Sequence, residues 1–127
     1  MDVYKTHGAF SWSELMTPDP KAAIAFYGQL LGWTSEDMDM GTGSYHVVKA
    51  GGSSIGGVMA PPPGAEGMPP MWGVYITVDD IDATAARCVE LGGKVLMPVM
   101  EVKTVGRMAV LQDPQGAVFS AITYAAG

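Results

Sequence analysis

Two ionisable side chains in the first half of the sequence, Glu14 and His46, could take part in chemistry. Glu14 lies in the strand-like stretch Phe10–Thr17, where alternation places it on the same face as Trp12. A carboxylate that a sheet partly removes from water can act as an acid or a base, whereas a structural one pairs with a lysine or arginine or reaches water. His46, in the strand-like stretch Ser44–Ala50, could bond a ligand near neutral pH or be an ordinary hydrogen-bonded side chain.

Aromatic and sulfur-containing side chains accompany these groups. Trp12, Trp72 and Tyr75 could form walls for an apolar or aromatic small molecule, with N–H and O–H groups to orient it, or could pack as ordinary core. Ten methionines add adaptable surface, which suits a pocket of loose specificity or plain core filling. Cys88 falls on the apolar stripe of a helical pattern, which predicts a buried, unreactive thiol.

An internal duplication supplies the elements that would position these residues. Phe10–Trp33 and Met71–Lys94 match after a shift of 61 positions, and each reads as strand, acidic cap, amphipathic helix and glycine stop. The caps are Asp19 and Asp80, whose carboxylates can accept hydrogen bonds from the first helical N–H groups. Three strand-like runs follow each helix, near residues 34–40, 44–50 and 54–60, and near 95–102, 107–112 and 117–124. The sequence therefore predicts two βαβββ modules.

The two modules are separated by Ala60–Pro70, which contains five prolines in eleven residues and predicts an extended, stiff linker. Module 1 then covers about residues 8–60 and module 2 about residues 71–125. Each has few residues for a core of its own, so we expect the two to form one domain over residues 1–127.

Composition and charge narrow the functional classes. The 127 residues are 48% hydrophobic and 16% charged, which favours a folded chain over a disordered one. Thirteen acidic and seven basic side chains give a net charge of −6 with no basic run, which argues against nucleic-acid and membrane partners. A single cysteine, no signal-like start and no long apolar run predict a soluble cytoplasmic protein.

Several motifs resemble the vicinal oxygen chelate superfamily, which includes glyoxalase, dioxygenases and bleomycin resistance proteins. The motifs are TPDPKAAIAFYGQLLGW at Thr17–Trp33, Val78-Asp79-Asp80 before the helix Ile81–Leu91, and GRMAVLQDPQGAVF at Gly106–Phe119. The resemblance covers about residues 8–125. It implies an α+β fold with eight strands and two main helices, in which the sheet curls into a ligand-binding cup.

The resemblance also implies metal ligands at the start of each module's first strand and on each module's last strand. In this sequence those positions are Trp12, Gly73, Ser120 and a residue near Gly57. None offers the imidazole, carboxylate or thiolate that divalent metals prefer. Neither last-strand stretch, Ser54–Met59 or Ala117–Tyr124, contains a carboxylate or a histidine. We therefore expect neither the usual metal centre nor another cofactor.

These observations favour a protein that binds a small apolar or aromatic molecule in a sheet-lined cavity without a metal. The expected ligand contacts are Trp12, Glu14, His46, Trp72, Tyr75 and Ser120. The alternative is a metal-dependent enzyme, a lyase, isomerase or dioxygenase, with a non-standard site and Glu14 as the candidate catalytic residue. A plain structural or regulatory domain is a third reading. The resemblance further implies a homodimer.

Overall fold

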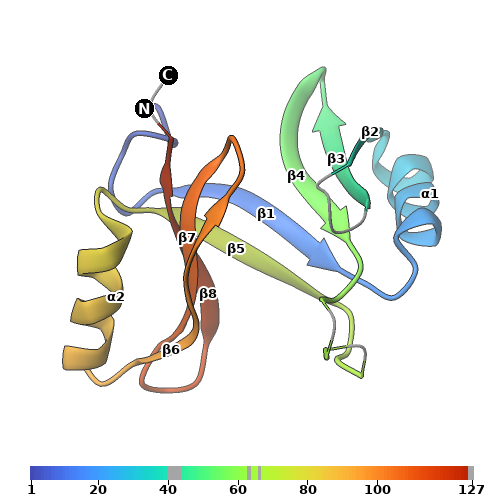
Figure 1. Cartoon of the computed structure of the whole chain (residues 1–127). Coiled ribbons are helices and arrows are strands. Elements are labelled where there is room, and N and C mark those ends of the chain that lie inside the picture. Colours follow the sequence, from blue (N-terminus) through green and yellow to red (C-terminus); the bar gives the residue numbers. More distant parts are fainter. Residues whose placement is uncertain (40–43, 63, 66, 126–127) are drawn as a thin grey trace. The chain divides into compact units, whose positions relative to one another are not determined.

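The computed structural model describes residues 1–39, 44–62, 64–65 and 67–125 (Figure 1). The chain divides into two compact units. The first unit is Trp12–Gly73, and the second unit is Val74–Gly127 together with Met1–Ser11. The described residues form eight strands and two helices, which confirms the predicted α+β fold. The prediction of a single domain over residues 1–127 stays a prediction.

The first unit has the order strand, helix and three strands. Its elements are β1 (Phe10–Met16, of which Phe10 and Ser11 belong to the second unit), α1 (Pro20–Leu31), β2 (Thr34–Asp39), β3 (Ser44–Ala50) and β4 (Ser53–Met59). Within the sheet the strand order is β2-β3-β4-β1. β1 and β4 run parallel, while the other neighbours are antiparallel.

The second unit repeats this order. Its elements are β5 (Met71–Thr77, of which Met71–Gly73 belongs to the first unit), α2 (Ile81–Glu90), β6 (Lys94–Val102), β7 (Gly106–Gln112) and β8 (Val118–Tyr124). The strand order is β5-β8-β7-β6, and β5 runs parallel to β8. The duplicated sequence therefore gives the same topology twice.

Both helices begin and end as the sequence predicts. The Asp19 carboxylate accepts a hydrogen bond from the Ala22 N–H at 3.1 Å, and Asp80 does the same for Ala83 at 3.1 Å. α1 stops at Gly32, whose φ of 76° lies in the left-handed region that glycine adopts without strain.

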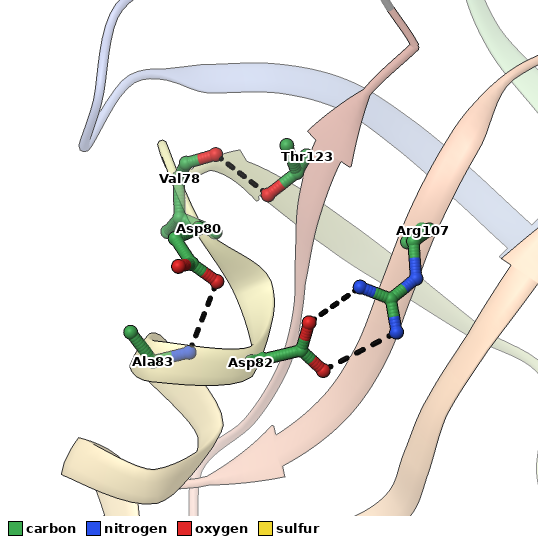
Figure 2. A network of polar contacts seen from close by, with 6 residues as sticks. All are labelled: Val78, Asp80, Asp82, Ala83, Arg107 and Thr123. Atoms are coloured by element: carbon green, nitrogen blue, oxygen red, sulfur yellow. Dashed lines mark hydrogen bonds and ion pairs between the residues drawn. The ribbon is translucent and has the colours of Figure 1, made fainter.

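An ion pair fastens α2 to its sheet. The two guanidinium nitrogens Nη1 and Nη2 of Arg107 on β7 donate to the two carboxylate oxygens of Asp82 in the first turn of α2 (Figure 2). The hydrogen bond from Arg107 holds the pKa of the Asp82 carboxyl below its ordinary value, and Asp82 raises the pKa of Arg107. Thr123 Oγ1 on β8 donates to the Val78 carbonyl at 2.9 Å, which ties the strand to the start of α2 (Figure 2).

Each unit buries an apolar cluster between its helix and one face of its strands. In the first unit the cluster is Leu15, Val48 and Val58, with Ala23, Ile24, Tyr27 and Trp33 packed against it. In the second unit it is Val78, Ile81, Ala109, Leu111 and Ala121, with Ala85, Cys88, Val99 and Phe119 around it. We call this the helix face of each sheet and the opposite side the far face. Cys88 packs against this cluster, as its stripe predicted, but it is only partly buried, because α2 does not fully cover it.

The proline-rich stretch differs in detail from the predicted extended linker. Among its described residues no helix or strand is present. The Ala65 N–H donates to the Pro62 carbonyl at 3.0 Å and the Met68 N–H donates to the Ala65 carbonyl at 3.0 Å, so two turns interrupt it. Glycines and an alanine between the prolines permit these turns. In the described part of the chain, no helix is long and apolar enough to span a membrane.

Candidate functional site

The far face of the first unit carries a chain of polar side chains drawn from β1 and β3. The indole N–H of Trp12 donates to the Tyr45 hydroxyl at 2.9 Å. That hydroxyl donates its own hydrogen to Glu14 Oε2 at 2.7 Å. Trp12 and Glu14 are two residues apart on β1, so strand alternation places them on one face, as the sequence predicted.

Glu14 is nearly buried, with 8% of its surface exposed. A buried carboxylate needs hydrogen-bond donors to replace the water that it loses, and the phenol of Tyr45 is one such donor. The phenol oxygen in turn accepts a hydrogen bond from the Trp12 indole N–H, so each hydrogen bond orients the next group. The three side chains therefore present an oriented carboxyl acceptor beside an aromatic ring.

A glycine on β4 makes room for this chain. Gly57 is paired with both Glu14 on β1 and Val47 on β3. A Cβ atom at Gly57 would lie 1.9 Å from the Tyr45 hydroxyl oxygen, far inside van der Waals contact. The Tyr45 phenol thus occupies the space that a side chain at Gly57 would take. Gly57 is also close to where the family resemblance placed a metal ligand, within Ile55–Met59.

The expectation that His46 joins Glu14 in one site is wrong. His46 is paired with Val58 and lies two residues from Val48, both of which belong to the apolar cluster under α1. Its imidazole, 5% exposed, is within hydrogen-bond distance of the Asp37 carboxylate on β2 through Nδ1. His46 therefore points to the helix face. Its neighbour Tyr45 lies on the far face with Glu14, because successive residues of a strand point to opposite faces of the sheet.

Trp72 also lies on the helix face, so its predicted position beside Trp12 is wrong. Its indole N–H donates to the Tyr27 hydroxyl of α1 at 3.1 Å, and its ring meets Tyr27 and Trp33 edge to face, with ring centroids 5.5 and 6.0 Å apart. Trp72 is part of an aromatic cluster beneath α1 and is 41% exposed.

Tyr75 and Ser120 share the far face of the second unit, where their backbones are paired across β5 and β8. The Tyr75 hydroxyl points to Met108 on β7, with an O–H···S distance of 3.8 Å. The N-terminal segment crosses the same side, since Thr77 Oγ1 donates to the Val3 carbonyl at 2.6 Å and the Tyr4 ring meets Tyr124 edge to face. This far face is thus partly covered by the N-terminal segment.

A separate hollow of about 470 Å³ lies on the helix face of the second unit. Its wall combines apolar side chains such as Leu111 and Phe119 with Cys88 and Arg87 of α2 and with His7. None of the six predicted ligand contacts lines it. The Asp79 N–H donates to His7 Nδ1 at 3.0 Å, which ties the N-terminal segment to the rim.

The residues at the family's metal positions do not fit a divalent ion. The Trp12 indole N–H is a donor and has no lone pair for a metal, and Gly57 and Gly73 have no side chain. The space over Gly57 is filled by the Tyr45 phenol. Over the described ranges, no three histidine, cysteine, aspartate or glutamate side chains gather closely enough to hold a metal. We therefore assign no chemical step to a metal.

The repeated βαβββ topology indicates the class of protein. The chain belongs to the Glyoxalase/Bleomycin resistance protein/Dioxygenase superfamily, whose family model matches residues 9–120. This confirms the resemblance that the sequence motifs indicated.

Curated relatives have up to 46% sequence identity to this chain. A Mycobacterium tuberculosis protein that carries the provisional name glyoxylase CFP32 is 46% identical over 116 residues, covering 91% of this chain and 44% of that protein. The anthracycline biosynthesis protein DnrV of Streptomyces peucetius is 37% identical over 126 residues, covering 89% of this chain and 46% of that protein. The chain thus spans a little under half the length of the curated relatives that it matches.

Solved structures support the fold alone, because their sequences have diverged widely. Methylmalonyl-CoA epimerase from Mycobacterium tuberculosis superposes with a TM-score of 0.67 at 17% identity, covering 94% of this chain and 89% of the other. The hypothetical protein BH1468 from Bacillus halodurans gives a TM-score of 0.73 at 14% identity, covering 96% and 98%.

Sequence reasoning missed Tyr45, the central member of the hydrogen-bonded chain. A signal was present in the sequence: Gly56 and Gly57 fall inside a strand-like run, and glycine in a strand often marks the close approach of another group. On an antiparallel neighbour, a large side chain such as Tyr45 is the natural group to fill that space.

Proposed function

We propose that this protein binds a small apolar or aromatic molecule on the far face of the first unit, without a metal. The observation that carries the proposal is the chain from Trp12 through Tyr45 to Glu14, with distances of 2.9 and 2.7 Å. Ligand sites commonly combine apolar and aromatic walls with a few placed polar groups, and this face has both.

The three side chains suggest what such a ligand would carry. The Trp12 indole is half-buried and held in one orientation by its hydrogen bond, so its ring offers a flat surface for stacking. The Glu14 carboxylate is a strong acceptor, which favours a ligand with a hydroxyl or amino hydrogen. A flat molecule bearing hydroxyl groups satisfies both requirements.

The relatives support the same ligand class. The anthracycline biosynthesis protein DnrV is 37% identical to this chain, and anthracyclines are hydroxylated polycyclic aromatic molecules. That protein is about twice as long as this chain, so its whole activity is not transferred here. Tyr75 and Ser120 belong to the second unit, and the expectation that they contact a ligand stays a prediction.

The test is a titration with 1,8-dihydroxyanthraquinone, followed by the change in its absorbance. We expect saturable binding that Trp12→Ala weakens by about tenfold or more, because the stacking surface is lost. Trp72→Ala is the matched control, since Trp72 lies on the helix face of the same unit and should leave the affinity within about twofold. Equal losses in the two variants, or no saturable binding in the wild type, would contradict the proposal.

A second candidate is an enzyme in which Glu14 moves a proton. The observation that favours it is a carboxylate only 8% exposed and 2.7 Å from a phenol, a setting in which a carboxylate can serve as a general base. Glu14→Gln retains an acceptor oxygen for Tyr45 but removes the base. An enzyme would then keep its substrate affinity and lose about 100-fold or more in turnover, whereas a binding protein shows no turnover in the wild type.

A further inference from the structure

The hollow on the helix face of the second unit has the size of a ligand site. Its volume of about 470 Å³ falls within the range of about 300–1,000 Å³ that ligand pockets occupy. Thr84 and Cys88 of α2 and Leu91 at the end of the helix are spaced by four and three residues and form one wall. Leu111 and Phe119 of the sheet also line it. Every lining residue belongs to the second unit, so the hollow depends on that unit alone.

The duplication explains why this space is open. The shift of 61 positions that relates the two copies equates Cys88 with Tyr27 of α1, and Lys94 with Trp33. In the first unit the Tyr27 ring packs against the apolar cluster and stacks on Trp33, with ring centroids 5.4 Å apart. At these two positions the second unit has a thiol and an ammonium group, so no aromatic ring from them fills the space beside its helix.

Two side chains on the wall of the hollow can donate hydrogen bonds to an occupant. His7 Nδ1 accepts a hydrogen bond from the Asp79 N–H at 3.0 Å, so the imidazole hydrogen is on Nε2, which can donate to a ligand. Arg87 contacts Glu90 through Nη1 at 3.4 Å, and five N–H donors let its guanidinium pair with a second acceptor. Among acceptors, a carboxylate forms the strongest hydrogen bonds with a guanidinium.

One acidic side chain, Asp113, also lines the hollow, and its own turn engages it. Asp113 Oδ1 accepts hydrogen bonds from the backbone N–H groups of Gln115 and Ala117, at 2.9 and 3.0 Å. These bonds stabilise the turn between β7 and β8 and partly neutralise the carboxylate. The donors of Arg87 and His7 therefore favour an anionic occupant over a cationic one.

We propose that this hollow binds a carboxylate attached to a single aromatic ring. The ring packs against Leu111 and Phe119, as the Tyr27 ring packs in the first unit. The carboxylate pairs with Arg87 and accepts a hydrogen bond from His7 Nε2. This site belongs to the second unit, whereas the proposed function concerns the far face of the first unit, so neither inference depends on the other.

The test follows the reaction of the Cys88 thiol with iodoacetamide in the full chain. Cys88 is the one cysteine of the sequence and lines the hollow, so a molecule bound there slows this reaction. We expect phenylacetate to slow it saturably, with half of the effect at about 1 mM. Phenylacetamide has the same shape without the charge and should need about tenfold more. No slowing by phenylacetate, or equal or stronger slowing by phenylacetamide or by the cation 2-phenylethylamine, overturns the proposal.

Arg87→Gln isolates the charged contact. This variant should need about tenfold more phenylacetate than the wild type, while its response to phenylacetamide stays within about twofold. Lys103→Gln in the turn between β6 and β7 is the matched control, because it removes the same charge at an exposed residue outside the lining of the hollow. Equal weakening in the two variants would show that the overall charge acts instead of Arg87, and would overturn the proposal.

Cys88→Tyr places in the second unit the ring that the first unit has at Tyr27, and it should close the hollow. Phenylacetate should then no longer shift the amide NMR signals of Leu91 and Gly93, which line the hollow. Val89→Tyr, at an exposed neighbouring position, should keep these shifts. Shifts that persist in Cys88→Tyr overturn the proposal. If that variant does not fold by circular dichroism, the thiol reaction in the wild type and the two charge variants decides.

Discussion

The two βαβββ units share their topology and helix caps but differ in what lies on their far faces. In the first unit the face carries the hydrogen-bonded side chains of Trp12, Tyr45 and Glu14. In the second unit the corresponding side has Tyr75 against Met108, and the N-terminal segment covers part of it. The duplication therefore conserves what folds each unit, while the surface residues are free to diverge.

The two helices also differ in polarity: α2 is the more charged helix and α1 the more apolar one. α2 carries Asp82 and Arg87, and Asp82 binds Arg107 of its own sheet, whereas α1 exposes Phe26 and Leu30. The unit with the polar far face thus has the apolar helix surface. The proposed ligand site on the far face of the first unit therefore has no counterpart of the same composition in the second unit.

The largest expected effect comes from filling the space over Gly57. Gly57→Ala forces the Tyr45 phenol aside, which adds about 1–3 kcal/mol of overpacking to the loss of its two hydrogen bonds. The combined variant Gly57→Ala with Tyr45→Ala should recover the overpacking part, because the ring is gone. Urea denaturation measures both changes in the free energy of unfolding.

Gly73→Ala is the control for this prediction. Among the described residues its added Cβ would meet the Glu14 carbonyl oxygen alone, at 3.9 Å, which is ordinary contact. If Gly57→Ala costs no more than Gly73→Ala, the phenol does not occupy that space.

A smaller effect distinguishes the two tyrosines. Tyr45→Phe removes a donor from Glu14 and an acceptor from Trp12, and we expect a loss of roughly 1–3 kcal/mol in the free energy of unfolding. Tyr75→Phe removes an O–H···S contact at 3.8 Å, which is weaker than either bond of the Tyr45 hydroxyl, so we expect a smaller loss. Thermal or chemical unfolding of the pair measures the difference, and equal losses would show that the polar chain contributes no special stability.

The smallest effect concerns acid stability in the second unit. Because Arg107 lowers the pKa of Asp82 in the folded chain, this pair stabilises the fold above the unfolded pKa of the carboxyl, near 4, and the contribution fades as the pH falls through the lowered value. Asp82→Asn should therefore reduce stability at pH 7 slightly and leave it unchanged at pH 2.

Salt supplies the control for the ion pair. Both partners are exposed, so added salt should shrink the difference between wild type and Asp82→Asn at pH 7. A difference that persists at pH 2 would mean that the substitution acts through something other than charge.

A separate pH effect is expected at Tyr124. Partial burial raises the pKa of its phenol, although the hydrogen bond with Ser11 opposes this shift. The folded state holds the proton more tightly than the unfolded state does. Stability is therefore retained below about pH 10 and declines above it, as the unfolded chain ionises first.

The sequence predicted the elements well, because the signals for them are local. Asp19 and Asp80 cap the helices, Gly32 ends the first one, and both modules have the predicted βαβββ order along the chain. These features depend on residues within a few positions of one another. Glu14 and Trp12 were also placed correctly on a common face, since alternation along one strand requires no other strand.

The errors in the predicted site concern residues whose face of the sheet is decided by contacts with other strands and the helix. His46 and Trp72 were assigned to the face of Glu14, but each lies on the helix face. Alternation states which residues of a strand share a side, not which side faces the helix. That choice follows from packing: Val48 and Val58 must be buried under α1, so His46 goes with them and Tyr45 goes to the far face.

The sequence by itself determined the duplicated topology, the helix boundaries, the membership of the family and the poor metal ligands at the family's metal positions. Only the tertiary structure brought Tyr45 over Gly57 and joined it to Trp12 and Glu14. The physical reason is that helix caps and periodicity act within one element. The hydrogen bonds among Trp12, Tyr45 and Glu14 depend instead on the register between the three strands β1, β3 and β4. The register between strands is set by which side chains are buried under the helix. That burial involves several elements, so no single stretch of sequence reveals it.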